Sequence, residues 1–297
     1  MLTRRRFATA SIATIAGGAA LGWRTPALSA ESGLSNLPDV FAKIETDSSG
    51  RLGVAVLDTK TGTIVGHRTD ELFPMCSTFK VLCAATILSR VDAGKEQLAR
   101  HIPITSGDIL DYAPVTKQHV GADMTVAELC EAMVTLSDNT AANLLLASIG
   151  GPASVTQYAR AIGDTVTRLD RTEPELNSAD ADDPRDTTTP AAMARNLQTL
   201  TIQTVLSPAL RELLNGWLIG SKTGSGKLRA GLPQDWRVGD KTGSGAHGTR
   251  NDIAVVWPTS HAPIMIAAYL TQTTVDEDKR NATFAAIGKA VSAAIAD

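Results

Sequence analysis

The 297-residue sequence has few of the residues that usually build a metal site. Its five histidines are scattered and form neither an H-x-H nor an H-E-x-x-H pair, and its three cysteines show no metal-ligand spacing. We therefore expect no metal site. The cysteines Cys76, Cys83 and Cys130 are typical of small buried side chains, and Cys83 with Cys130 is the one pair that two packed helices could bring within disulfide reach.

Excess positive charge is also absent. The formal net charge is −3, and residues 1–30 contribute four arginines and no acidic residue, so the remainder holds 24 basic and 31 acidic residues. This mild acidity argues against nucleic acid or an anionic membrane as a partner, because both carry negative charge. No segment after residue 30 is apolar enough to span a bilayer.

The first thirty residues are typical of an export signal. A twin arginine within Thr3-Arg4-Arg5-Arg6-Phe7 precedes a short, Ala- and Gly-rich apolar run over residues 8–21, and Leu28-Ser29-Ala30 offers small residues for cleavage. We expect twin-arginine-type export, a mature chain that starts near Glu31, and a periplasmic or secreted, monomeric protein. The alternative is a retained membrane anchor.

The hydrophobic pattern predicts strands at both ends of the mature chain, over residues 51–58, 63–67, 236–242, 252–257 and 264–271. Between them the pattern is mainly helical, including residues 189–201 and 208–219, and helices at 38–46 and 276–295 flank the whole. We predict an α/β fold in which a five-stranded antiparallel sheet from both chain ends is flanked by helices. The sheet lobe would comprise about 31–70 plus 220–297, and an inserted helical lobe about 71–219.

A serine at the mouth of an apolar helical segment is the first candidate for catalysis. Ser77 and Lys80 are three residues apart and so share one helix face. Ser77 would also lie near free backbone N–H groups at the helix N-terminus, which stabilise a developing oxyanion. The arrangement predicts an activated nucleophile, although S-x-x-K alone is also typical of a capped helix with a solvated lysine.

Three further motifs follow in order. They are Ser137-Asp138-Asn139 between two helices, Glu173-Pro174-Glu175-Leu176-Asn177 inside the irregular segment 168–190, and Lys241-Thr242-Gly243-Ser244-Gly245 at the end of a predicted strand. The set S-x-x-K, S-D-N and K-T-G belongs to serine β-lactamases and penicillin-binding proteins. With the Glu173 loop, the chain resembles a class A β-lactamase over residues 38–295.

This resemblance implies hydrolysis of the β-lactam amide of penicillins and cephalosporins through an acyl-Ser77 intermediate, without a cofactor, and so β-lactam resistance. Either Lys80 or Glu173 would be the base in acylation, and Ser137 would pass a proton to the departing nitrogen. Lys241 would favour a neutral Lys80 and attract an anionic substrate. The backbone N–H groups of Ser77 and Ser244 would hold the oxyanion, and Asn139 would bind the substrate's side-chain amide.

The same resemblance assigns Glu173 and Asn177 to the water that hydrolyses the acyl-enzyme. It also implies a cis peptide bond before Pro174 and an ion pair between Arg171 and Asp186 at the neck of the loop. Two related functions share part of the motif set. A D-alanyl-D-alanine carboxypeptidase would normally lack the Glu173 loop, and a β-lactam sensor would need a membrane tether and no efficient deacylating base.

Substrate contacts follow from the resemblance as well. Thr242, Ser244 and the aromatic side chain of Tyr112 are expected at the cleft, and Arg250 is the expected ligand of the substrate carboxylate, with a basic residue at Lys227 as the alternative in many relatives.

A second copy of the Lys-Thr-Gly-Ser-Gly motif, at residues 222–226, follows a helix and not a strand, so we assign the catalytic role to Lys241. Cys83 is one residue from the family's usual disulfide position. The substrate spectrum is left open.

Overall fold

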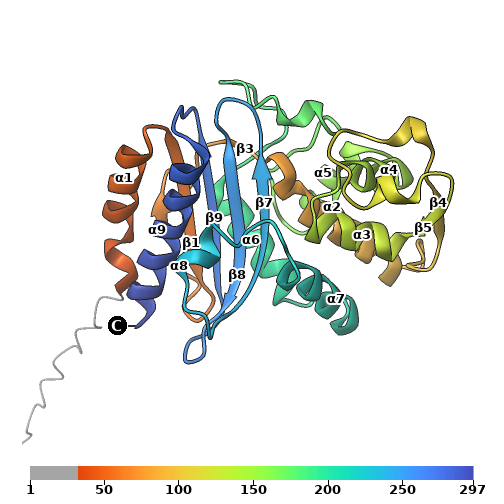
Figure 1. The fold of residues 1–297 in the computed structure, drawn as a ribbon. Helices are drawn as coiled ribbons and strands as arrows, with labels where there is room; N and C mark the ends of the chain where they lie inside the picture. Colours follow the sequence, from red (N-terminus) through yellow and green to blue (C-terminus); the bar gives the residue numbers. More distant parts are fainter. Residues whose placement is uncertain (1–32, 297) are drawn as a thin grey trace, which may run out of the picture. The chain divides into compact units, whose positions relative to one another are not determined.

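The central feature is an antiparallel sheet built from both ends of the chain. The computed structural model describes residues 33–296, and the predicted export signal lies outside them. Five strands lie in the order β2-β1-β9-β8-β7 (Figure 1), namely β1 (Arg51–Asp58), β2 (Ile64–His67), β7 (Arg237–Ser244), β8 (Arg250–Trp257) and β9 (Ile264–Thr271). Strand β1 pairs with β9 in the register Arg51↔Thr271 to Asp58↔Ile264. The predicted five-stranded sheet is thereby confirmed.

Alternation along the strands divides the apolar side chains between two cores. Val54 and Val56 of β1 pack with residues of α1 (Leu37–Ser48) and α9 (Glu277–Ala296), whereas Ala55 and Leu57 belong to the core on the opposite face. Helices α1 and α9, with the short α8 (Leu228–Gly231), cover the first face (Figure 1). Both faces of the sheet are therefore buried.

Helix α2 (Phe79–Asp92) runs through the helical part of the molecule, and every side chain from Phe79 to Leu88 is buried. Around it lie α3 (Val126–Thr135), α4 (Asn139–Ile149), α5 (Pro152–Ala161) and α7 (Pro208–Ile219). Two short strand pairs join the connecting segments. They are β3 (Phe73–Pro74) with β6 (Thr187–Thr188), and β4 (His101–Pro103) with β5 (Asp123–Thr125). Because α2 begins with the residues that follow Ser77, its packing fixes the position of the first motif.

One helix packs against a different surface from the one expected. Helix α6 (Pro190–Thr201) was expected in the inserted helical lobe, but it packs on β1 and β9, with Met193 and Leu197 in the same core as Met265. The apolar stripe of a helix shows that one face is buried but does not identify the surface that it contacts. Here that surface is the second face of the sheet.

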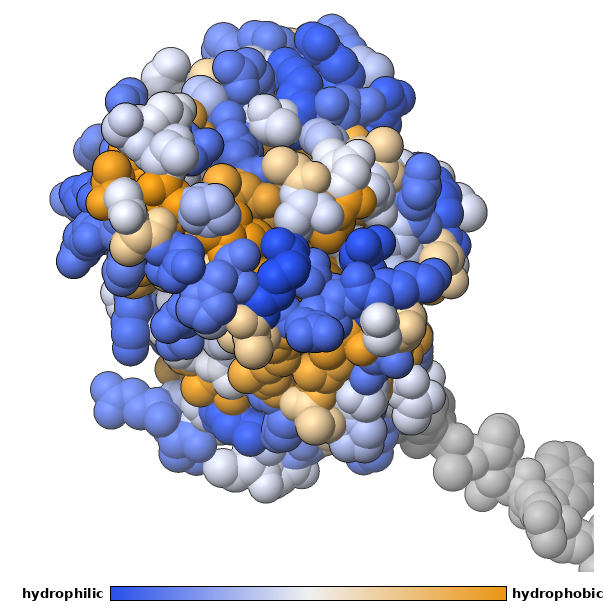
Figure 2. Space-filling view, turned by 90° about the vertical axis from the view of Figure 1, so that its right-hand side faces the viewer, coloured by the Kyte–Doolittle hydropathy of each residue, from blue (hydrophilic) through white to orange (hydrophobic). Residues whose placement is uncertain are grey.

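Cys76, Cys83 and Cys130 are all buried free thiols, so the disulfide left open above is not formed. No helix within residues 33–296 combines the length and apolarity that crossing a bilayer requires. On the face shown in Figure 2, apolar side chains appear between hydrophilic ones.

Candidate active site

Ser77 lies in the 3₁₀ turn Cys76–Thr78, directly before α2. The turn is held from two sides, because Thr78 Oγ1 donates to the Met75 carbonyl at 2.8 Å and Asn251 Nδ2 of β8 donates to the same carbonyl at 2.9 Å. Cys76 has a φ of +45°, which is strained for a residue with a side chain. Cys76, which directly precedes the nucleophile, is thus held in an unfavourable backbone conformation. Ser77 itself is 8% exposed.

Lys80 lies one helical turn further on and is completely buried. Its Nζ is 3.0 Å from Glu173 Oε1 and donates to the Ser137 carbonyl at 2.8 Å and to Asn139 Oδ1 at 2.6 Å. Burial lowers the pKa of Lys80, and the neighbouring Glu173 carboxylate acts in the opposite direction. One ammonium group therefore connects three of the four motifs.

The second motif lies at the junction between α3 and α4. Asp138 is the N-cap of α4, and its buried carboxylate accepts hydrogen bonds from the backbone N–H groups of Ala141, Val115 and Thr116 at 2.9 Å each. Ser137 has a φ of +60°. Asp138 thus serves as the anchor, while its neighbours Ser137 and Asn139 contact Lys80.

Glu173 is held by both its backbone and its side chain. Asn143 of α4 accepts from the Glu173 N–H at 3.0 Å and donates to its carbonyl at 2.8 Å, and Asn177 Nδ2 donates to Glu173 Oε2. Ser77 Oγ donates to Glu173 Oε1 at 3.1 Å. The buried Asn177 Oδ1 has no hydrogen-bond partner in the structure. An unused acceptor beside a carboxylate is a place for a water molecule.

The neck of this loop matches the expectation from the resemblance. The Glu173–Pro174 peptide bond is cis, and Arg171 Nε donates to Asp186 Oδ2 at 2.6 Å. Asp186 Oδ1 also accepts from the backbone N–H groups of Asp170 and Arg171. The predicted cis bond and ion pair are both confirmed.

Lys241 is contributed by β7, the edge strand that faces the helical part of the molecule (Figure 1). It is completely buried, and its Nζ donates to Ser137 Oγ at 3.0 Å and to the Thr242 carbonyl at 2.8 Å. Burial, assisted by the positive charge of Lys80, lowers the pKa of Lys241 to about 7. Ser137 Oγ thus lies between two lysines, Lys241 and Lys80, the second at 3.3 Å.

Two glycines allow β7 to approach the Ser77 turn closely. A Cβ on Gly243 would lie 2.9 Å from the Met75 carbonyl oxygen, and one on Gly245 would lie 2.7 Å from Cys76 Sγ. A side chain at either position would push the strand away from the nucleophile. The requirement for K-T-G is therefore steric as well as electrostatic.

These residues border a cleft of about 360 Å³. Its walls are formed by Ser77, Tyr112, Ser137, Asn139, Asn177, Thr223, Lys227, Thr242, Gly243 and Ser244. Lys80, Glu173 and Lys241 lie buried behind these walls. Within residues 33–296, no group of three or more His, Cys, Asp and Glu side chains is arranged to hold a metal ion.

Arg250 is the one residue expected to contact substrate that does not line this cleft. Its guanidinium binds Glu277 of α9, with NH2 2.6 Å from Glu277 Oε2, whereas Lys227 lines the cleft. The geometry thus favours the alternative cation, Lys227.

Sequence reasoning missed Thr223 and Asn143. Thr223 belongs to the rejected second copy of the K-T-G motif, yet its Oγ1 is 2.6 Å from Thr242 Oγ1 and it lines the cleft. The segment that carries Thr223 is held against the buried carboxylate of Asp240, which accepts from Ser221 Oγ at 3.1 Å. The repetition of the motif was the one available signal.

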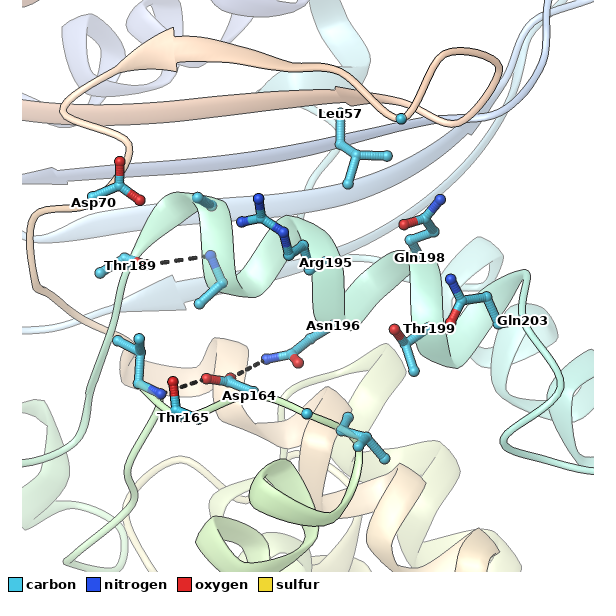
Figure 3. Close-up of a pocket in the computed structure, with 16 residues that line it drawn as sticks. Leu57, Asp70, Asp164, Thr165, Thr189, Arg195, Asn196, Gln198, Thr199 and Gln203 are labelled. Carbon is cyan, nitrogen blue, oxygen red and sulfur yellow. Dashed lines mark hydrogen bonds between the residues drawn. The ribbon is translucent and has the colours of Figure 1, made fainter.

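A second polar cavity, of about 340 Å³, lies beside α6 (Figure 3). Its buried acid, Asp164, accepts hydrogen bonds from Asn196 Nδ2 at 2.6 Å, from the Val166 N–H at 2.8 Å and from the Thr167 N–H at 2.9 Å. These bonds tie the loop after α5 to α6. We interpret Asp164 as structural.

The cleft unites a serine hydroxyl, a carboxylate in contact with it, two buried lysines and a second hydroxyl. This set can activate a nucleophile, protonate a leaving group and position a water molecule. The fold and the site together therefore define a serine hydrolase that works through an acyl-enzyme.

Comparison with known proteins identifies the family. A model of the β-lactamase enzyme family matches residues 36–295. β-Lactamase L2 of Stenotrophomonas maltophilia is 47% identical, over 97% of this chain and 98% of that protein, and β-lactamase CTX-M-8 of Citrobacter amalonaticus is 46% identical, over 85% and 87%. The solved structure of the last common ancestor of Gram-negative bacteria class A β-lactamase is 62% identical with a TM-score of 0.86, over 87% of this chain and 99% of that one.

The chain belongs to the β-lactamase enzyme family, and within it to the class A serine β-lactamases.

Proposed function

We propose that this protein hydrolyses the β-lactam amide of penicillins and cephalosporins through an acyl-Ser77 intermediate and thereby confers β-lactam resistance. The observation that carries the proposal is the contact between Ser77 Oγ and Glu173 Oε1 at 3.1 Å, with the unpaired Asn177 Oδ1 beside the same carboxylate. One carboxylate is thus placed to serve both the serine and a hydrolytic water.

In the acylation step, Ser77 Oγ attacks the lactam carbonyl carbon and loses its proton. The direct hydrogen bond supports Glu173 as the group that accepts this proton, and the lowered pKa of Lys80 supports Lys80 as the alternative. The C–N bond then breaks as Ser137 Oγ gives a proton to the nitrogen. The proton taken from Ser77 returns to Ser137 through Lys80, which contacts both Glu173 and Ser137, so Glu173 is again a carboxylate before deacylation. Lys241 and Lys80, which contact Ser137 Oγ, can stabilise the charge that develops there.

In the deacylation step, a water held by Glu173 and Asn177 attacks the ester carbonyl. Glu173 takes the water proton, the ester C–O bond breaks, and Ser77 Oγ regains a proton. Asn143 and Asn177 fix the carboxylate so that little reorganisation is needed during the reaction. Efficient hydrolysis of the acyl-enzyme is the step that distinguishes a β-lactamase from a β-lactam sensor or a carboxypeptidase.

For substrate binding, we assign the carboxylate of the antibiotic to the part of the cleft formed by Thr242, Ser244 and Lys227. Lys241 adds positive charge from behind the wall. We assign the side-chain amide to Asn139 and an apolar wall to the half-exposed Tyr112, both of which line the cleft. The backbone N–H groups of Ser77 and Ser244 are assigned to the oxyanion.

The test follows hydrolysis of a chromogenic cephalosporin by the mature protein, with intact mass recorded during and after the reaction. Sustained turnover with a transient adduct on Ser77 is expected. A stable stoichiometric adduct without turnover would instead indicate a sensor or penicillin-binding protein.

We further propose twin-arginine-type export with cleavage near Glu31, action in the periplasm or outside the cell, and a monomer in solution. The twin arginine and the apolar run of residues 1–30 support export. Replacement of Arg4 and Arg5 by lysine should retain the protein inside the cell, which fractionation would show.

A further inference from the structure

The guanidinium of Arg250 is occupied on all three of its nitrogens. Nε is 2.9 Å from Glu277 Oε2, NH2 is 2.6 Å from the same oxygen, and NH1 donates to the Thr249 carbonyl at 2.7 Å. This is a two-nitrogen contact with one carboxylate, which fixes the plane of the guanidinium as well as its position. Only 19% of the Arg250 side chain is exposed.

Arg250 nevertheless starts from the rim of the cleft. It pairs with Ser244 across β7 and β8, and residues that are directly opposite in an antiparallel pair point to the same face. Ser244 lines the cleft. The two side chains therefore lie on the same side of the sheet, and the contact with Glu277 directs that of Arg250 toward α9.

Glu277 is surrounded by positive charge. Arg280 NH2 is 3.4 Å from Glu277 Oε2, and the charges of Arg250, Arg280 and Lys227 together hold the pKa of Glu277 below its usual value, the hydrogen bond from Arg250 being the largest cause. Lys227 itself lines the cleft and forms no ion pair with any residue from 33 to 296. Glu277 thus pairs with Arg250 and Arg280, whereas Lys227 lines the cleft.

We propose that Glu277 is a specificity-determining positioning residue, which holds Arg250 out of the cleft and leaves Lys227 as the cation that receives the substrate carboxylate. The inference rests on the proposed function, because the carboxylate is that of the β-lactam. Glu277 does not touch substrate; it acts through Arg250. Its removal should add a second cation to the carboxylate subsite.

The test compares KM and kcat of Glu277→Gln with those of the unaltered enzyme, using a cephalosporin with a free carboxylate and its neutral methyl ester. We expect KM for the acid to fall about 3- to 10-fold, as one added charge contact in a partly solvated site would produce, with kcat changed less than about 2-fold, because the contact is made equally in ground and transition states. KM for the ester should not change.

Two controls make the result specific. Asp278→Asn removes the same charge from the next, exposed residue of α9 and should leave both KM values unchanged. Glu277→Gln combined with Arg250→Ala should abolish the fall in KM, since the released arginine is then missing. Thermal unfolding of each variant checks that the fold is retained.

An unchanged or higher KM for the acid in folded Glu277→Gln would overturn the inference, as would a fall that persists without Arg250. If the unaltered enzyme shows no turnover of any β-lactam, the proposed function itself fails and this inference fails with it. Turnover with unaltered kinetics in the variant rejects the inference alone.

Discussion

The cleft and the cavity beside α6 have similar volumes, about 360 and 340 Å³, and polar groups line part of both, yet these groups differ in their hydrogen bonding. In the cavity, the carboxylate of Asp164 accepts three hydrogen bonds from its own fold, of which the bond from Asn196 is visible in Figure 3. At the cleft, Asn177 Oδ1 has no hydrogen-bond partner among residues 33–296, Ser77 Oγ contacts a carboxylate, and the two lysines behind the wall have lowered pKa values.

The comparison shows that volume and polarity do not identify a catalytic site. Hydrogen bonds that are satisfied within the protein rigidify it, whereas unused acceptors and shifted pKa values remain available to a substrate. Four predictions sharpen this contrast, beginning with the largest expected effect on turnover.

Replacement of Glu173 by glutamine should stop turnover at the acyl-enzyme. The amide cannot take a proton from water, so we expect steady-state kcat to fall by about 10²- to 10⁴-fold, the usual range for loss of a general base. Mass spectrometry should detect an accumulated adduct on Ser77. Glu175→Gln, at an exposed position of the same loop, is the control and should keep near-normal turnover. Rapid turnover by Glu173→Gln would exclude the deacylation role.

Gly243→Ala should impair catalysis by displacing β7 from the nucleophile. The added Cβ would lie 2.9 Å from the Met75 carbonyl oxygen, so the strand or the turn must shift. Small displacements of reacting groups can cost about 10²-fold in rate, and we expect kcat/KM to fall by about 10- to 100-fold. Gly216→Ala in α7, where a Cβ meets nothing within 4 Å, is the matched control. Equal activity of both variants would contradict the steric argument.

The affinity for anionic substrates should weaken as pH rises. The pKa of Lys241 is lowered to about 7, so the side chain is charged below that pH and loses its charge above it. KM for a carboxylate substrate is therefore expected to rise several-fold between pH 6 and pH 9, by the loss of about one nearby charge. Lys241→Arg, which stays charged throughout this range, should flatten the profile. The same slope in both proteins would refute the assignment.

Asp164→Asn tests the cavity beside α6. The substitution removes one acceptor from a set of buried hydrogen bonds, so the free energy of unfolding should fall by about 1–3 kcal/mol. Activity per folded molecule should not change. Asp70→Asn, at an exposed residue of the same cavity, should alter neither quantity. Loss of kcat/KM without loss of stability would show that the cavity takes part in function.

Much of this protein follows from local patterns in its sequence. The strand Ile264–Thr271 and the helix Pro208–Ile219 have the predicted bounds, and the T-x-x-E sequence from Thr125 to Glu128 forms a capping box. Such signals are reliable because side-chain period, capping and turn chemistry act over a few residues. The four motifs are likewise short, and their resemblance to one family predicted the fold and the class of enzyme.

Side-chain partners that are distant in the chain were decided by the tertiary structure. Arg250 meets Glu277 because β8 and the first turn of α9 come together, and nothing local to Arg250 indicates that its charge is taken. Helix α6 contacts the sheet, and Thr223 reaches Thr242, for the same reason. Sequence alone determined which chemical groups this enzyme possesses; packing between distant segments decided which of them face the cleft, because burial and pairing depend on the whole fold.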